Sequence, residues 1–144
     1  MGAPTLGIIG AGQLAQMTLA PAAALGVHLQ ILAADSGDSA AQFFPSTIGD
    51  YKDLNHLIEF ASKCDVITFE HELVPNGHIR RLEELGHTVR PSSGALLHAQ
   101  DKAHMRKSFA SINLPQPRWK VVTAVSEIDS YPVILKSISG GYDG

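Results

Sequence analysis

Near the carboxyl end of the 144-residue sequence, one lysine is placed for phosphate chemistry. Lys136 closes the apolar run 132–135, and Gly140-Gly141-Tyr142-Asp143-Gly144 follows within a few residues. The lysine supplies a point charge, and the glycines let backbone N–H groups approach phosphate oxygens without a Cβ in the way. A lysine that reaches from a core to solvent is the alternative. The glycine loop favours a lid that binds nucleotide phosphates.

A second glycine pattern lies near the amino end. Gly10-x-Gly12-x-x-Ala15 follows an apolar segment, and Asp35 comes about twenty residues later, which matches the dinucleotide-binding fingerprint. Small residues suit any tight strand-to-helix turn, so NAD binding and a general anion pocket both stay open. Gln13, an amide at the start of the expected helix, suits hydrogen bonding to a sugar or phosphate.

Two carboxylates and an imidazole lie together in Thr68-Phe69-Glu70-His71-Glu72. This motif follows an apolar strand pattern, at the strand end where doubly wound sheets bind ligands. Neither His-Glu-x-x-His nor a Cys/His spacing supports a metal site within this span. Helix capping by one glutamate is the structural alternative. We favour contact between Glu70 and a hydroxyl or amine of a substrate.

The elements that position these residues alternate along the first two thirds of the sequence. Gly26 is typical of the residue just past the end of a helix, and Asp53 is typical of the N-cap residue that precedes one. Strands are expected at 5–9, 27–33, 46–48, 66–69 and 88–90, and helices at 13–25, 54–63 and 75–85. This alternation predicts an α/β fold with a Rossmann-like parallel sheet.

The pattern changes after residue 97. A helix is expected from Lys102 to about Ile112, followed by strands at 119–122 and 133–136 of a different, antiparallel sheet. We therefore place a Rossmann-like domain at 1–97 and the incomplete start of a second domain at 98–144. A glycine loop over phosphate works only when the next strand returns from it. We expect the chain to be the N-terminal piece of a longer enzyme.

Composition excludes several classes of protein. Hydrophobic residues make up 44% and charged residues 17%, with a net charge of −3, as in ordinary globular domains. There is no basic stripe interleaved with aromatics, which argues against nucleic-acid binding. Polar residues and glycines interrupt the uncharged segment 5–27, so neither a signal peptide nor a membrane span fits. The single cysteine, Cys64, suits a reducing compartment. We expect a cytoplasmic protein.

Taken in order, the motifs resemble the N5-carboxyaminoimidazole ribonucleotide synthase family of ATP-grasp ligases. The resemblance spans the chain, and its most distinctive part is the terminal glycine loop. The segments that carry it are Gly10-Ala11-Gly12-Gln13-Leu14, Thr68-Phe69-Glu70-His71-Glu72 with Val74-Pro75, Arg90-Pro91-Ser92, Gln100-Asp101-Lys102, Pro132-Val133-Ile134-Leu135-Lys136 and Gly140-Gly141-Tyr142-Asp143-Gly144.

The resemblance implies a pre-ATP-grasp domain followed by the truncated beginning of an ATP-grasp domain. It implies ATP-dependent carboxylation of 5-aminoimidazole ribonucleotide with bicarbonate, through carboxyphosphate, in purine biosynthesis. ATP and Mg²⁺ are the implied cofactors, with the Mg²⁺ ligands expected downstream of residue 144. Family members are commonly homodimers, and a fragment of this length should not turn over alone.

The resemblance also assigns residues to two sets. The ATP-binding set is Lys102, Lys136, Gly141, Tyr142, Asp143 and Gly144. The set near the aminoimidazole nucleotide is Gln13, Glu70, Tyr142 and Asp143, and Asp143 is also the catalytic candidate. Position 102 is often arginine in the family, so Lys102 is a mild departure.

Two alternatives remain. One is another ATP-grasp ligase, such as a formate-dependent glycinamide ribonucleotide transformylase or a biotin carboxylase-like protein. The other is a regulatory module that binds NAD through Gly10, Gly12 and Asp35 and gives Lys136 no role.

Overall fold

The computed structural model describes residues 2–140. By its internal contacts the chain divides into two units, Met1–Leu96 and Leu97–Gly144. The first unit is folded around a sheet, and the described part of the second contains helical residues, a short 3₁₀ turn and extended chain. The domain boundary between residues 97 and 98 stays a prediction.

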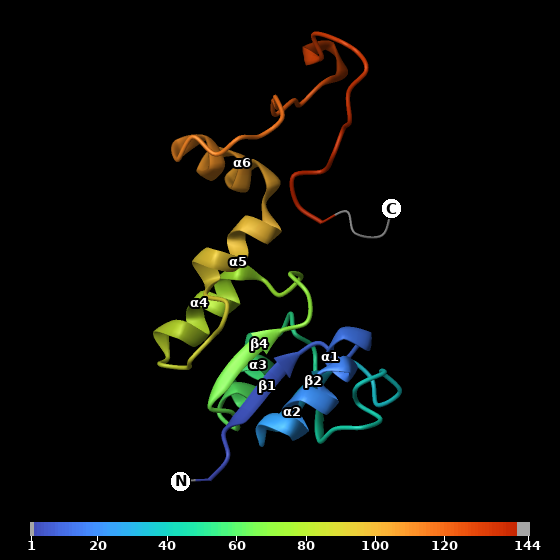
Figure 1. Cartoon of the computed structure of the whole chain (residues 1–144), viewed down its shortest axis with the longest axis vertical. Helices are drawn as coiled ribbons and strands as arrows, with labels where there is room; N and C mark the ends of the chain where they lie inside the picture. The colour runs from blue at the N-terminus through green and yellow to red at the C-terminus, as the bar shows by residue number, and fades with distance from the viewer. Residues whose placement is uncertain (1, 141–144) are drawn as a thin grey trace. The chain divides into compact units, whose positions relative to one another are not determined.

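A four-stranded parallel sheet forms the centre of the first unit (Figure 1). Its strands are β1 (Thr5–Ile9), β2 (His28–Ala33), β3 (Ser46–Ile48) and β4 (Val66–Phe69), in the order β3-β2-β1-β4. Strand β1 pairs in parallel with both β2 and β4. The chain therefore winds outward from β1 in two directions, which leaves a crevice at the carboxyl ends of β1 and β4. The α/β fold expected from the sequence is confirmed.

Helices cover both faces of this sheet. Ile8 packs in a cluster with residues of α1 (Gln13–Met17) and α2 (Leu19–Leu25). Its neighbour Ile9 packs in the opposite cluster, with residues of α3 (Leu54–Ala61) and α4 (Asn76–Glu84). Figure 1 shows α2 and α3 on opposite sides of the sheet. Burial on both faces explains why the strands read as continuous apolar runs.

The expected helix 13–25 is two helices in the structure, separated at Thr18. The reason is Pro21, which has no N–H and whose ring would clash with the carbonyl of Met17 in a continuous helix. A new helix beginning at Leu19 places Pro21 in a first turn, where no donor is needed. Gly26 ends α2 at φ 66°, as expected for a left-handed C-terminal residue.

The other helix ends follow local side-chain signals. Asp53 caps α3 as expected, because its side chain accepts a hydrogen bond of 2.8 Å from the N–H of Asn55. Helix α5 (Ser93–Gln100) was not expected. Ser93, its first residue, donates from N and Oγ to the Glu83 carboxylate at 2.8 and 2.5 Å.

The expected fifth strand at 88–90 is wrong in extent. Only one parallel bridge forms there, between Ile67 and Val89, with N···O distances of 2.8 Å from Ile67 to Thr88 and from Arg90 to Ile67. Pro91 follows at once and cannot donate to a ladder, which limits the pairing.

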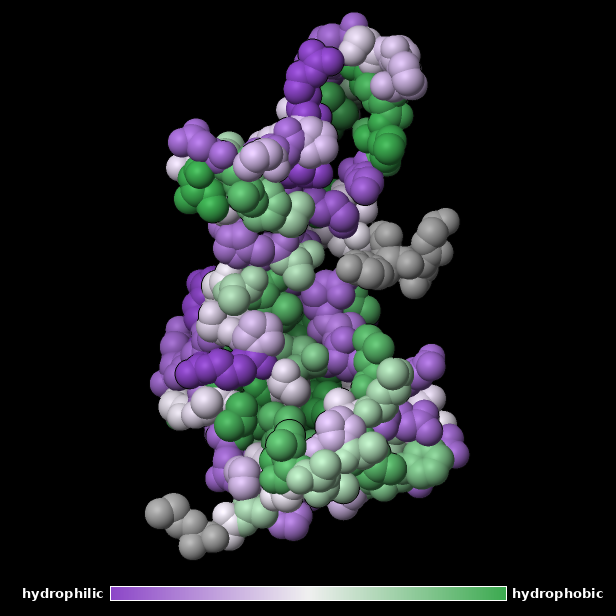
Figure 2. All heavy atoms as spheres, viewed as in Figure 1, coloured by the Kyte–Doolittle hydropathy of each residue, from purple (hydrophilic) through white to green (hydrophobic). Residues whose placement is uncertain are grey.

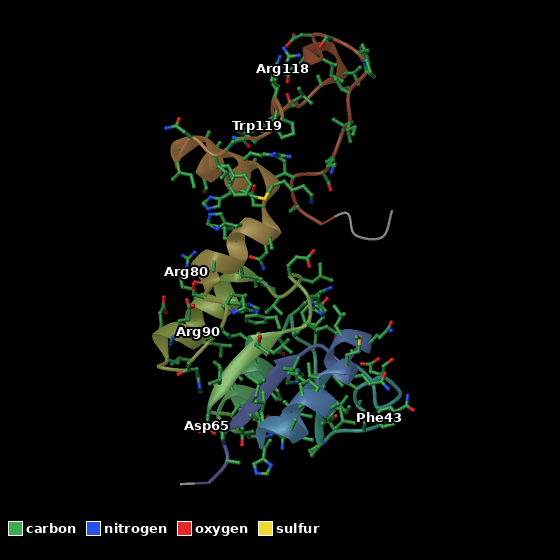
Figure 3. The ribbon with its side chains drawn as sticks, in the orientation of Figure 1. Phe43, Asp65, Arg80, Arg90, Arg118 and Trp119 are labelled. Carbon is green, nitrogen blue, oxygen red and sulfur yellow. The ribbon has the colours of Figure 1, made fainter. Side chains whose placement is uncertain are left out.

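The beginnings of β1 and β4 are joined by a side chain. Asp65, which directly precedes β4 and is labelled in Figure 3, accepts a hydrogen bond of 2.7 Å from the N–H of Thr5, the first residue of β1.

In the second unit, α6 (Lys102–Ser111) matches the expected helix, and Asp101 caps it by accepting from the N–H of His104 at 2.7 Å. The strands expected at 119–122 and 133–136 are wrong: the only regular element described after α6 is the 3₁₀ turn η1 (Val125–Glu127). A strand needs a neighbour to pair its backbone groups, and no segment between residues 97 and 140 supplies one.

The extended stretch of the second unit therefore exposes apolar side chains. Ile134 is 85% exposed and Leu135 71% exposed. Figure 2 shows hydrophobic atoms on the segment that Figure 1 draws in red. Trp119, labelled in Figure 3, is 38% exposed. Among the described helices, none is long and apolar enough to cross a membrane.

Candidate functional site

The glycine turn and the Glu70 motif meet at the crevice between β1 and β4. Gly10 follows the end of β1, and Glu70 follows the end of β4. The N–H of Glu70 donates to the carbonyl of Ile9 at 2.9 Å, which joins the two strand ends. The two motifs therefore lie side by side at the carboxyl ends of adjacent parallel strands, where doubly wound sheets bind ligands.

The Glu70 carboxylate lies over the amino end of α1. Oε2 accepts from the N–H of Gly12 at 2.6 Å, and Oε1 accepts from the N–H groups of Leu14 and Ala15 at 3.0 and 3.4 Å. These groups carry the partial positive charge of a helix amino end, so the carboxylate is stabilised there. The structural alternative, helix capping, is what Glu70 does in this structure. Its contact with a substrate stays a prediction.

Glu70 also explains the glycines of the fingerprint. A Cβ on Gly10, which has φ 110°, would lie 2.8 Å from the Cβ of Glu70. A Cβ on Gly12 would lie 2.5 Å from Oε1 of the same side chain. The glycines therefore make room for a carboxylate of the protein itself.

This arrangement weakens the NAD alternative. In dinucleotide-binding domains the pyrophosphate takes the N–H groups at this helix end. Here those groups already bond to Glu70, and its negative charge would repel a phosphate. Asp35, the expected ribose contact, instead accepts a hydrogen bond of 2.7 Å from the N–H of Gly37 within its own loop.

An open pocket of about 340 Å³ lies above the glycine turn, within the first unit. Its lining has two carboxylates, one imidazole and one phenol, and neither lysine nor arginine. The lining residues are Gly10, Ala11, Gly12, Leu14, Leu32, Ala34, Asp38, Tyr51, Glu70 and His71.

Three polar lining residues were not among the predicted site residues. Asp38 comes after β2, Tyr51 after β3 and His71 after β4. The signal that could have found them is position, because side chains just beyond the carboxyl ends of parallel strands converge on one edge. His71 also lies next to Glu70 in the recognised motif. Gln13, which was predicted, is the exposed first residue of α1 and does not line this pocket.

The imidazole of His71 is held on two sides. Its ring meets the ring of Tyr51 edge-on, with centroids 5.0 Å apart and an interplanar angle of 63°. Its Nδ1 accepts a hydrogen bond of 3.3 Å from the N–H of Leu73. These two contacts orient the ring at the edge of the pocket.

In the second unit, the predicted ATP contact Lys102 lies beside Ile138 and Gly140, where the glycine loop begins. Its Nζ donates to the carbonyl of Gly140 and its backbone N–H to that of Ile138, both at 2.9 Å. Lys136 lies on the exposed stretch. Four predicted residues, Gly141, Tyr142, Asp143 and Gly144, lie outside the described part of the chain.

Within residues 2–140, no three His, Cys, Asp or Glu side chains gather as a metal site would require. The described residues thus do not offer a Mg²⁺ site.

Comparison with known proteins agrees with this architecture. Residues 3–100 match the family model described as ribonucleotide synthetase preATP-grasp domain. Over 99% of the chain, the sequence is 42% identical to N5-carboxyaminoimidazole ribonucleotide synthase of Mycobacterium tuberculosis. The resemblance stated from the motifs is confirmed.

Solved structures give the same result for the fold. A crystal structure of an N5-carboxyaminoimidazole ribonucleotide synthetase in complex with ADP matches 100% of the chain and 40% of its own, with a TM-score of 0.89 and 28% identity. The Thermotoga maritima synthetase matches 85% of the chain and 34% of its own, with a TM-score of 0.78 and 25% identity. The chain spans 35% of the length of the Mycobacterium relative.

Proposed function

Because the chain belongs to the ribonucleotide synthetase preATP-grasp family, we propose that it is the N-terminal part of an N5-carboxyaminoimidazole ribonucleotide synthase. In the proposed reaction, ATP transfers its γ-phosphoryl group to bicarbonate and forms carboxyphosphate and ADP. The exocyclic amine of 5-aminoimidazole ribonucleotide then attacks the carboxyl carbon and releases phosphate. The observation that carries the proposal is the identity of 42% with the Mycobacterium synthase over nearly the whole chain.

The first unit would serve the aminoimidazole nucleotide. Its pocket presents oriented carboxylate and imidazole groups, and Glu70 is already fixed by three backbone N–H groups. A site whose polar groups are held in place before binding loses less entropy when the ligand arrives. Gln13, from the exposed start of α1, would contact the same nucleotide outside this pocket.

The second unit would serve ATP. Phosphoryl transfer depends mainly on positioning and charge neutralisation, which suits Lys102, Lys136 and the loop 141–144. The hydrogen bond from Lys102 to Gly140 supports a common site for the lysine and the loop. Carboxyphosphate hydrolyses in water, so a closing loop would also protect the intermediate. Tyr142 and Asp143 would reach the nucleotide substrate, with Asp143 as the catalytic candidate.

We further infer that Mg²⁺ accompanies ATP, with its ligands downstream of residue 144, and that the complete protein is a cytoplasmic homodimer. No step is assigned to the metal. When bound, it would neutralise charge on the phosphates.

The test is turnover by the full-length gene product. With ATP, bicarbonate and 5-aminoimidazole ribonucleotide, we expect ADP to form only when all three are present, and N5-carboxyaminoimidazole ribonucleotide to accumulate. Turnover with glycinamide ribonucleotide and formate instead would assign the chain to another ATP-grasp ligase. Calorimetry that finds tight NAD binding and indifference to ATP would contradict the proposal.

Lys136→Ala in the same protein tests the lysine. Loss of one charged phosphate contact should weaken ATP binding by about 1.5–3 kcal/mol. Lys107→Ala is the matched control, because Lys107 is also exposed in the second unit and is not an expected ATP contact. Equal ATP affinities in the two variants would show that Lys136 does not contact the phosphates.

A further inference from the structure

We infer that His71 is a further substrate-binding residue, and that with Glu70 it binds a vicinal diol, the ribose hydroxyls of the ribonucleotide, so that the phosphate lies outside this pocket. The inference rests on the proposed function, since it names the part of that substrate that enters the first unit.

The contacts of His71 fix which ring nitrogen can donate. The N–H of Leu73 donates to Nδ1, so Nδ1 carries a lone pair and the proton of the neutral ring is on Nε2. Cδ2, the carbon bonded to Nε2, lies 3.4 Å from the position of a Cβ on Gly10. This edge of the ring therefore faces the glycine turn that lines the pocket. Among the described residues, Nε2 has no hydrogen-bond partner.

Glu70 supplies the complementary acceptor. Oε1 already accepts two backbone N–H groups, whereas Oε2 accepts one, from Gly12. A carboxylate oxygen has two acceptor positions, so Oε2 can take one further hydrogen bond. The pocket thus offers one N–H donor and one acceptor on adjacent residues, His71 and Glu70.

A vicinal diol matches this pair. One hydroxyl donates a hydrogen bond to the Glu70 carboxylate, and the oxygen of the neighbouring hydroxyl accepts a hydrogen bond from Nε2 of His71. A phosphate does not match, because it is an anion and the lining has Asp38 and Glu70 but no cationic side chain. Asp38 is itself held in the loop, with Oδ2 accepting from the N–H groups of Ala34 and Asp35 at 3.1 and 3.0 Å.

The first experiment replaces His71 in the full-length gene product. His71→Phe keeps an aromatic ring against Tyr51 and removes the donor. We expect the KM for 5-aminoimidazole ribonucleotide to rise about tenfold, with kcat and the KM for ATP nearly unchanged, because one hydrogen bond made equally in ground and transition states is lost. His71→Gln keeps an N–H donor and should recover most of the loss. His87→Phe, outside the pocket, is the matched control and should change nothing.

The second experiment uses 2′-deoxy and 3′-deoxy analogues of the substrate. The wild-type protein should bind both about tenfold more weakly. For the analogue that lacks the hydroxyl bound by His71, His71→Phe should cause no further loss, because the two changes remove the same interaction.

The outcomes separate the two proposals. Suppose that the wild-type protein turns over the ribonucleotide. If His71→Phe then has an unchanged KM for the ribonucleotide, the diol inference is overturned and the proposed function stands. The same holds if the loss caused by the deoxy analogue and the loss caused by His71→Phe add in full. If His71→Phe does not fold, a KM equal to wild type in His71→Leu overturns it, and a rise of about tenfold there supports it. Absence of wild-type turnover overturns both.

Discussion

The two units contain similar apolar strand patterns but use them differently. In the first unit, Ile8 and Ile9 of β1 are 3% and 0% exposed, and every buried hydrophobic residue of the described chain lies at or before Leu96. In the second, Ile134 and Leu135 are 85% and 71% exposed. Each strand of the first unit pairs with a neighbouring strand of the same unit. An apolar pattern therefore indicates that a segment can be buried, and the partner decides whether it is.

The strongest test of this comparison replaces one isoleucine in each unit. Ile79→Ala removes a fully buried side chain in α4 and should lower the free energy of unfolding by about 2–5 kcal/mol. Ile134→Ala, at an exposed position, should change it by about 0.5 kcal/mol or less. Urea unfolding of the 144-residue chain, followed by circular dichroism, measures both. Similar losses in the two variants would mean that the stretch around Ile134 is packed in solution.

Much of the first unit could be predicted from the sequence because its signals are local. Gly26 and Asp53 mark helix ends through their own backbone and side-chain chemistry, and the alternation of strands and helices predicts a parallel sheet. The division of the helix at Thr18 was also readable, since Pro21 forbids a continuous helix.

The rest depends on groups that are distant in sequence. Glu70 accepts hydrogen bonds from the N–H groups of Gly12 and Leu14, which lie 58 and 56 residues earlier in the sequence. Neither the glycine motif nor the Glu70 motif alone therefore shows that this carboxylate occupies the place of an anion at the amino end of α1. The strands expected at 119–122 and 133–136 failed for a related reason, because a strand pattern does not contain its partner. The strand ends pointed to Glu70, which lines the pocket, but the other polar lining residues Asp38, Tyr51 and His71 were not identified, and their contact with a substrate stays a prediction.

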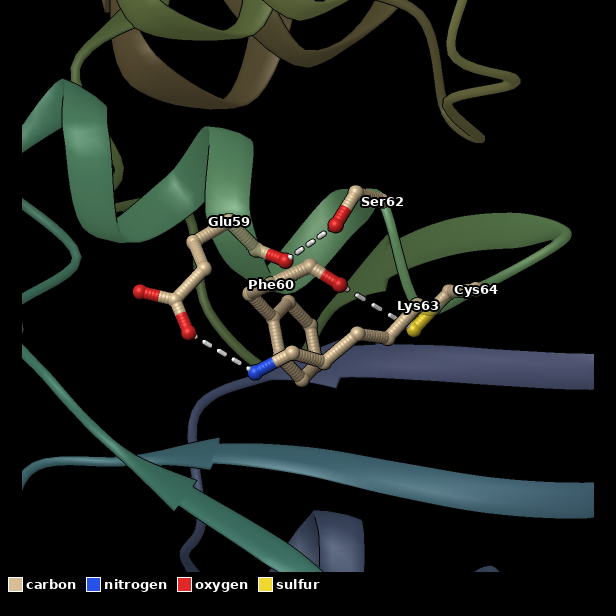
Figure 4. A network of polar contacts seen from close by, with 5 residues as sticks. All are labelled: Glu59, Phe60, Ser62, Lys63 and Cys64. Atoms are coloured by element: carbon tan, nitrogen blue, oxygen red, sulfur yellow. Dashed lines mark hydrogen bonds and ion pairs between the residues drawn. The ribbon is translucent and has the colours of Figure 1, made fainter.

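A titration tests burial in the first unit with a smaller effect. Cys64 is half-buried, its Sγ lies 3.6 Å from the carbonyl of Phe60, and burial, with a lesser contribution from Asp65, raises the pKa of the thiol to about 11 (Figure 4). Between the ordinary value of 9.0 and about 11, the unfolded chain loses this proton while the folded chain keeps it. The contribution of Cys64 to the free energy of unfolding is therefore fully present below pH 9.0 and is lost as pH rises toward about 11.

Cys64→Ala should remove that part of the pH dependence. The measurement compares urea midpoints of the two proteins below pH 9.0 and near pH 11. Parallel pH profiles would show that the thiol is as solvated in the folded chain as in the unfolded one. Slow alkylation of Cys64 at neutral pH, and fast alkylation in urea, is the independent check, because the thiolate is the reactive form.

The smallest expected effect concerns one exposed glutamate in each unit, whose pKa values are both lowered for different reasons. The pKa of Glu59 is lowered chiefly by the hydrogen bond that its carboxylate accepts from Lys63 at 2.9 Å (Figure 4). The pKa of Glu127 is lowered chiefly by a hydrogen bond from the backbone N–H of Thr123, and next by one from the Thr123 hydroxyl, each at 2.9 Å. Both carboxylates favour the folded state above their ordinary pKa of 4.5, and that contribution is lost as pH falls through the folded-state values.

NMR titration of the two side chains distinguishes these causes. Lys63→Ala should return the pKa of Glu59 toward its ordinary value and leave that of Glu127 unchanged. Added salt should act in the same direction on Glu59, because an exposed ion pair is screened, and much less on Glu127, whose main donors are uncharged. Thr123→Val should raise the pKa of Glu127 only in part, since the backbone donor remains. If salt removed both shifts equally, the Thr123 turn would not be formed in solution, and the second unit would be less ordered than its hydrogen bonds indicate.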